Sequence, residues 1–164
     1  MALDVGDRWI GVAIADESGT IASPVGRVER GTRGGKGRGE GDGSALAEIG
    51  RLVAEWEVTR LVVGLPTGLS GREGPQAATV RAFVAAVAGA LGPEPPIVFW
   101  DERLTTTIAE RSLIATGARR DQRRREIDAV AAAVILQSFL DAARSRRLAA
   151  EAHAQGQAAR SRGG

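Results

Sequence analysis

Residues 2–16, ALDVGDRWIGVAIAD, contain two short apolar runs separated by a tight turn at Gly6-Asp7. A single acid, Asp4, interrupts the first run. Two apolar runs joined in this way predict an antiparallel hairpin. A third run of similar character follows, so the N-terminal part of the chain predicts a three-stranded meander with strands at 2–5, 8–15 and about 20–29.

The remainder of the chain alternates between helical and strand patterns. Helices are predicted from Ser44 to about Trp56, over 75–91, from Thr105 or Thr106 to Thr116, and over 127–146, with strands at 61–63 and 97–100. Alternation of this kind predicts parallel strands connected by right-handed crossovers. The whole chain therefore predicts an α/β fold, in which a mixed sheet of three antiparallel strands followed by parallel strands is flanked by helices.

The chain of 164 residues is long enough for one domain with a hydrophobic core. We place this domain at residues 1–147. Within it, residues 31–43 contain seven glycines mixed with charges, which predicts a flexible loop. Residues 148–164 are rich in Ala, Gln, Arg and Gly, and this tail is predicted either to prolong the last helix or to be frayed or disordered.

Composition excludes several classes of protein. Cysteine is absent, which excludes disulfides and thiolate metal sites. There is no apolar run of about 18 residues and no signal-type N-terminus, so a soluble, cytoplasmic protein without a membrane partner is expected. The sequence pI of 10.2 reflects a net charge of only +2 in a chain with one lysine and no tyrosine, and it is weak evidence for nucleic-acid binding.

Three acids stand where predicted apolar elements begin or end. They are Asp4 in the first strand, Glu102 after the last strand, and Asp128 at the start of the last helix, with Asp101 beside Glu102 as a further candidate. A buried carboxylate costs several kcal/mol unless it is paired or bound to a metal. The predicted topology allows the three to converge, and clustered carboxylates without His or Cys suit Mg²⁺ or Mn²⁺. Two such ions, about 4 Å apart, can support phosphodiester cleavage.

Each acid also has a simpler interpretation. Asp4 could accept hydrogen bonds from the turn that follows it, and Asp101 or Glu102 could cap the next helix. Asp128 could be an acid in the first turn of its helix, where the helix dipole stabilises a negative charge. The only histidine, His153, lies in the tail and is a poor candidate for catalysis. There is no Walker-type phosphate loop, which excludes that class of nucleotide hydrolase.

Basic residues cluster just before Asp128. This patch, and the further candidates for nucleic-acid contacts, are Arg119, Arg120, Arg123, Arg124 and Arg125, then Arg72 and Arg103. Phosphates approaching the acids would meet the patch, although a solvated linker is the alternative. Thr105 and Thr106 are expected to cap a helix or to contact phosphate. Few aromatic residues are present, so structured RNA recognised by backbone and shape is favoured over stacked single strands.

Four segments resemble the YqgF family, also called RuvX. They are ALDVGDRWIGVAIAD, LVVGLPTGLSGREG, DERLTT and IDAVAAAVILQSFL, in the family's order. The resemblance implies an RNase H-like fold and a nuclease with divalent metal ions, acting in the cytoplasm on the 5′ end of pre-16S rRNA during ribosome biogenesis. By position, Asp4, Glu102 and Asp128 match the acids of that superfamily, and the resemblance implies that they hold the metal and are catalytic.

Other functions remain open at this point. The substrate could be a branched DNA (a Holliday junction), which a homodimer would favour over a monomer, although junction resolvases carry an acid where this chain has Gly64-Leu65-Pro66. A phosphate-binding hairpin of the actin type would need a second domain. The chain could also be an RNA-binding assembly factor without activity. Acids scattered over the surface, or tied permanently to arginine, would remove the basis for a nuclease.

Overall fold

The computed structural model describes residues 1–31, 42–66, 74–101 and 120–161, and for 120–126 and 156–161 it describes the backbone alone. Several predicted features lie outside these ranges. They are most of the glycine-rich loop, the predicted helix that ends at Thr116, and the residues Arg72, Glu102, Arg103, Thr105, Thr106 and Arg119.

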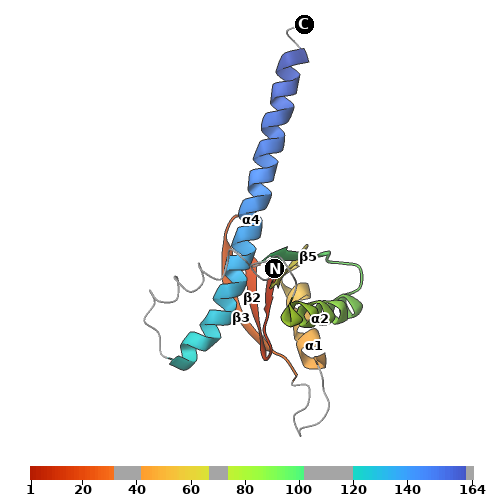
Figure 1. Cartoon of the computed structure of the whole chain (residues 1–164), viewed down its shortest axis with the longest axis vertical. Coiled ribbons are helices and arrows are strands. Elements are labelled where there is room, and N and C mark those ends of the chain that lie inside the picture. Colours follow the sequence, from red (N-terminus) through yellow and green to blue (C-terminus); the bar gives the residue numbers. More distant parts are fainter. Residues whose placement is uncertain (32–41, 67–73, 102–119, 162–164) are drawn as a thin grey trace.

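The core of the fold is a five-stranded mixed sheet (Figure 1). Its strands are β1 (Ala2–Val5), β2 (Trp9–Ala15), β3 (Ala22–Glu29), β4 (Leu61–Leu65) and β5 (Ile97–Asp101), in the spatial order β3-β2-β1-β4-β5. The first three pair antiparallel, and β1, β4 and β5 pair parallel. The predicted mixed sheet is confirmed, and β1 is its central strand.

Local turn chemistry explains the antiparallel half. The Gly6 N–H donates to the Trp9 carbonyl oxygen over 3.0 Å and closes the first turn. In the second turn the Asp16 carboxylate accepts hydrogen bonds from the N–H groups of Thr20 and Ile21 at 2.7 and 2.8 Å. Gly19 supplies the positive φ of +64° that this turn requires.

Two helices, α1 (Gly43–Glu55) and α2 (Pro75–Leu91), cover one face of the sheet (Figure 1). The apolar residues of alternate strand positions meet those of the helices in the main core, which includes Leu3, Val5, Ile10, Val12, Leu61, Val63, Ile49, Leu52, Val80, Phe83 and Val87. Arg30, just beyond β3, is buried beside this core and makes a bidentate ion pair with Asp42 at 3.1 Å. Its remaining amino group donates to the Gly6 carbonyl oxygen, so it ties the start of α1 to the first turn.

The other face of the sheet is covered by the long helix α4 (Arg120–Ser161) (Figure 1). Small residues dominate this second core, which contains Ala2, Ala13 and Val62 of the sheet with Ala132, Ala133, Ile135 and Leu136 of the helix. Small side chains allow the helix backbone to approach the sheet closely. At Gly11 the approach is so close that a Cβ atom would overlap the Asp128 carbonyl oxygen.

The last helix differs from its prediction at its start. Residues 120–126, for which the sequence favours a basic linker, form its first turns, so Asp128 is the ninth residue of α4 rather than its opening residue. Arginine, glutamine and glutamate are good helix formers, and neither Gly nor Pro occurs from 120 to 155. The helix also extends through the predicted tail to Ser161, while the domain division at residue 147 stays a prediction.

In the part of the chain that the structure describes, no helix has a stretch long and apolar enough to cross a membrane.

Gly11→Ala should lower the free energy of unfolding by about 3 kcal/mol, because the new methyl group overlaps helix backbone that cannot rotate away. Gly26→Ala on the adjacent strand β3 is the matched control, since a Cβ atom there meets nothing within 4 Å. We expect it to change stability by less than about 1 kcal/mol. Urea unfolding of both variants measures the difference, and equal stabilities would show that α4 does not rest on Gly11.

Candidate active site

Asp4 lies in the middle of the sheet, on the face that α4 covers. In the register of the antiparallel strands Asp4 stands opposite Gly11, and Gly11 stands opposite Arg27. Residues directly opposite one another in paired strands project to the same face. Asp4, Gly11 and Arg27 therefore form one row across β1, β2 and β3. The absence of a side chain at Gly11 leaves the space above the middle of this row to the helix.

The Asp4 carboxylate is held in an unfavourable environment. Burial, and to a lesser extent repulsion from Asp128, raises its pKa from 3.8 to about 6. Among the residues that the structure describes, none forms a hydrogen bond or ion pair with this carboxylate. The first turn is closed by backbone groups instead, through Gly6 and Trp9. The alternative that Asp4 serves the following turn is therefore excluded.

Asp128 comes to the same place from the opposite layer. Its own carbonyl oxygen rests over Gly11, which fixes this turn of α4 against β2 and brings its carboxylate within electrostatic reach of Asp4. Burial raises the pKa of Asp128, and the hydrogen bond and charge of Arg27 oppose that rise. Because Asp128 is two turns inside the helix, the alternative of a first-turn acid is wrong.

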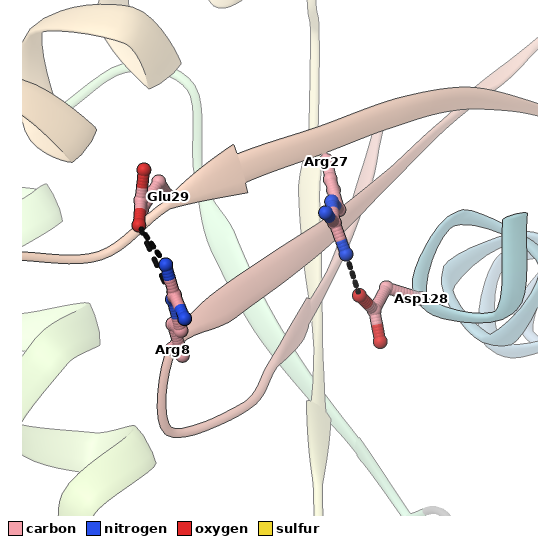
Figure 2. A network of polar contacts seen from close by, with 4 residues as sticks. All are labelled: Arg8, Arg27, Glu29 and Asp128. Carbon is pink, nitrogen blue, oxygen red and sulfur yellow. Dashed lines mark hydrogen bonds and ion pairs between the residues drawn. The ribbon is translucent and has the colours of Figure 1, made fainter. Parts of the chain in front are cut away.

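Arg27 is a residue of this site that sequence reasoning missed. Its Nη1 atom lies 3.5 Å from Oδ2 of Asp128, while the face of its guanidinium lies 3.6 Å from the centre of the Trp9 ring. Figure 2 shows Arg27 reaching from β3 towards Asp128 on the helix. The contact is long for a charge-assisted hydrogen bond, and Arg27 and Asp128 keep 16% and 31% of their side chains exposed, so Asp128 is neutralised only in part.

The structure describes three further sets of residues considered from the sequence. Asp101 ends β5 opposite Leu65, whose side chain belongs to the core under α1 and α2, so the register places Asp101 on the face opposite to Asp4. His153 lies on the exposed distal part of α4. Of the predicted basic patch, the structure gives only the helical backbone of Arg120, Arg123, Arg124 and Arg125.

The structure thus brings together two of the three predicted acids. The third, Glu102, lies outside the described residues, and among those described no cluster of three potential ligands occurs. Two hard oxygen donors that repel each other fit Mg²⁺ or Mn²⁺, since a cation relieves both the desolvation and the repulsion. Magnesium is commonly held by one or two carboxylates together with waters. The donor set present is therefore compatible with a divalent cation.

Asp4→Asn should stabilise the metal-free protein by about 1–3 kcal/mol at pH 7.5. Because the folded-state pKa of about 6 lies above the ordinary value of 3.8, the contribution of Asp4 to stability is complete below pH 3.8 and is lost as the pH rises through about 6. The advantage of the variant should shrink to less than about 1 kcal/mol at pH 4. Urea unfolding in EDTA at the two pH values measures it.

The Met1 amino group changes stability with pH in the opposite direction to Asp4. Because the wild type and Asp4→Asn both carry it, its contribution cancels in the difference between their free energies of unfolding. Burial lowers the pKa of this amine from 8.0 to about 6, so its effect makes the protein more stable as the pH rises between those values. A variant that is less stable than the wild type at pH 7.5 would contradict the charged, desolvated state assigned to Asp4.

Known proteins resemble the chain over nearly all of the described domain. The family model RuvX, described as Holliday junction resolvase, matches residues 1–142. A protein of Roseiflexus sp. (strain RS-1) named "Putative pre-16S rRNA nuclease" is 44% identical over 144 residues, which cover 88% of this chain and 94% of the relative. A protein of the same name from Nocardioides sp. is 44% identical over 150 residues, covering 88% of each chain.

The fold has a counterpart among solved structures. RuvC of Thermus thermophilus, an RNase H-like protein, superposes with a TM-score of 0.50 at 15% identity, over 87% of this chain and 94% of that one. At this identity the likeness concerns the fold, and it agrees with the mixed sheet flanked by helices. The family assignment rests on the sequence match over residues 1–142 and on the relatives, and by both the chain belongs to the RuvX family.

Proposed function

We propose that this chain is a divalent-metal-dependent nuclease that cleaves RNA phosphodiester bonds in 5′-end processing of pre-16S rRNA. The observation that carries the proposal is the pair of Asp4 and Asp128, which repel each other on the face under α4 and lack any sufficient counter-charge among the described residues. Family membership and the names of the relatives support a nuclease, and a cytoplasmic location fits that substrate.

In the proposed site Asp4, Asp128 and Glu102 hold Mg²⁺ or Mn²⁺, as two ions. Such ions activate a water and stabilise the leaving oxygen of the phosphodiester. The register of β5 disfavours Asp101 as the third ligand, because it places Asp101 on the face opposite to Asp4. Trp100, one residue earlier, lies on the α4 face, where its indole N–H donates to Ser138 Oγ over 3.2 Å.

Arg27 acts in this proposal as a counter-ion that a metal can replace. It partly neutralises Asp128 while no cation is bound, which limits the repulsion between the two carboxylates. Stacking on Trp9 holds the guanidinium in place when Asp128 turns to the metal. Arg27 then remains beside the acids, where it can meet a phosphate oxygen of the substrate. Contacts of the predicted residues Arg72, Arg103, Arg119, Arg120 and Arg123–Arg125, and of Thr105 and Thr106, belong to the same proposal.

A branched DNA is the second candidate substrate, because the family is described as a Holliday junction resolvase. The two substrates share the chemistry and differ in geometry. A resolvase cuts two strands symmetrically and would favour a homodimer, whereas cleavage of an RNA leader requires a single site. Cleavage of a four-way junction and of a pre-16S rRNA 5′ leader in one assay separates them.

Asp4→Asn should reduce Mn²⁺- or Mg²⁺-dependent cleavage of the rRNA leader at least about 100-fold, because one of the metal ligands loses its charge. Asp101→Asn is the matched control, since it removes the same charge from the opposite face of the sheet. We expect it to retain activity within about tenfold. Undiminished cleavage by Asp4→Asn would contradict the proposed site. Absence of any Mn²⁺ effect on both stability and RNA binding would instead favour the non-catalytic assembly factor.

Arg27→Gln should lower the melting temperature of the metal-free protein by about 3 °C, since the carboxylate pair loses its counter-charge. It should also enlarge the rise in melting temperature that Mn²⁺ causes, because the cation now relieves a larger repulsion. Arg8→Gln is the control. Arg8 pairs with Glu29 on the exposed edge (Figure 2) and does not touch either acid. A Mn²⁺-induced rise that is smaller in Arg27→Gln than in Arg8→Gln would refute this role.

A further inference from the structure

The distal part of α4 extends beyond both the sheet and the family match. The last residues of the helix that pack on the sheet are Phe139 and Leu140, and the family match ends at residue 142. From 143 to 155 every side chain is exposed, and the helical backbone continues to Ser161. Figure 1 shows this part of the helix projecting away from the body of the molecule towards the C-terminus. We call residues 143–161 the helical extension.

The helical extension and the three residues after it account for the positive charge of the chain. Residues 143–164 contain five arginines and one acid, Glu151. Residues 1–142 contain 17 basic and 19 acidic residues, so the part that matches the family is slightly negative. A polyanionic substrate is therefore not attracted by the overall charge of residues 1–142. The net positive charge of the chain therefore lies in the C-terminal segment, and the arginine patch at 119–125 is a local basic cluster within residues 1–142.

Three arginines of the extension have described side chains, Arg144, Arg146 and Arg147, and all are exposed. The Arg146 guanidinium lies 5.9 Å from the centre of the Trp100 ring, at the base of the extension. Arg147 makes only a long contact of 3.7 Å with Glu151 and keeps 74% of its side chain exposed. These weak contacts leave the guanidinium groups available for phosphate oxygens.

The extension has a fixed spacing from the acid pair, because Asp128 and the arginines lie on one helix. The Arg146 Cα atom lies five complete helical turns, about 27 Å along the axis, beyond that of Asp128, and its side chain leans back so that the guanidinium approaches Trp100. Between them, beside Leu136, Phe139 and Leu140 of α4, lies a hollow whose charged lining is Asp16, Glu17, Glu55, Glu57 and Arg60, so acids outnumber bases there and phosphates are disfavoured. The arginines of the extension and the acid pair therefore form two separate surfaces for nucleic acid.

Charge decides which partner fits the extension. A second copy of the extension would carry the same positive charge and be repelled, and Leu148 is the one large apolar residue between 143 and 155. A sufficient apolar surface for a helix pair is therefore lacking over those residues. We propose that the helical extension is a second nucleic-acid-binding surface, which holds backbone phosphates of the structured RNA at arginines whose Cα atoms lie about 24–29 Å along the helix axis from Asp128. This inference rests on the proposed function in taking RNA as the ligand.

Binding of two RNA hairpins in EDTA tests the proposal without any cleavage. One hairpin has a stem of about 20 base pairs and the other has a stem of about six, which is shorter than about 20 Å. The full-length chain is compared with the triple variant R144Q/R146Q/R147Q, and affinity is measured between 50 and 200 mM salt. Arg51→Gln is the control, because Arg51 is an exposed arginine of α1, outside the helical extension, that pairs with Glu48 and Glu55.

For the long hairpin, the slope of log affinity against log salt should fall by about 2–3 in the triple variant, or about 0.7–0.9 for each lost phosphate contact. The short hairpin, which reaches only one surface at a time, should show a smaller fall in slope, and Arg51→Gln should match the wild type on both. Because all three side chains are exposed, the far-ultraviolet circular dichroism and melting temperature of the triple variant should equal those of the wild type, which verifies that it folds.

The outcomes separate this inference from the proposed function. If the wild type and the triple variant bind the long hairpin with the same salt slope, the second surface is overturned and the nuclease proposal stays intact. An equal loss on both hairpins would also overturn it, because the arginines would then act by charge alone and not at a distance. If the wild type binds a four-way DNA junction but neither RNA hairpin, both proposals are overturned.

Discussion

The fold depends on a contact between backbone and backbone, at the point where α4 crosses β2. Gly11 has no side chain, and the Asp128 carbonyl oxygen occupies the space that a Cβ atom would need. Small residues on both sides, such as Ala13 and Ala132, extend the close approach along the helix. This contact sets the height of α4 above the sheet, and with it the separation of the two carboxylates. The structural core and the candidate site are thus determined by the same absence of a side chain.

The site is an electrostatic compromise. Asp4 is desolvated and repelled by Asp128, and its raised pKa of about 6 means that its charge destabilises the folded, metal-free chain near neutral pH. Arg27 offsets part of this destabilisation through a long ion pair, and Trp9 keeps the arginine in position. Such an arrangement makes sense if a stronger cation completes it, since a site optimised for stability alone would have no reason to keep both acids.

Much of this architecture could be predicted from the sequence, because its signals are local. The alternating apolar runs and the turn at Gly6-Asp7 predict the hairpin, and the later alternation of helix and strand predicts the parallel half. Asp4 stands out as a charge within an apolar strand. Arg27 could not be found this way, since its role depends on the register that sets it opposite Gly11. The predicted start of α4 is wrong because a run of arginines suits a solvated linker as well as a helix.

The length of α4 has a mechanical consequence. α4 is held against the sheet from the contact between Asp128 and Gly11 to Phe139 and Leu140, and only the arm beyond them is unsupported. A tilt of about 5° at Leu140 would move the far end of the helix at Ser161, about 31 Å further along the axis, by about 3 Å while Asp128 stays still. The far arm can thus follow an irregular ligand while the geometry of the carboxylates is preserved. The same continuous helix thus gives a movable extension at its C-terminal end and a fixed position at Asp128.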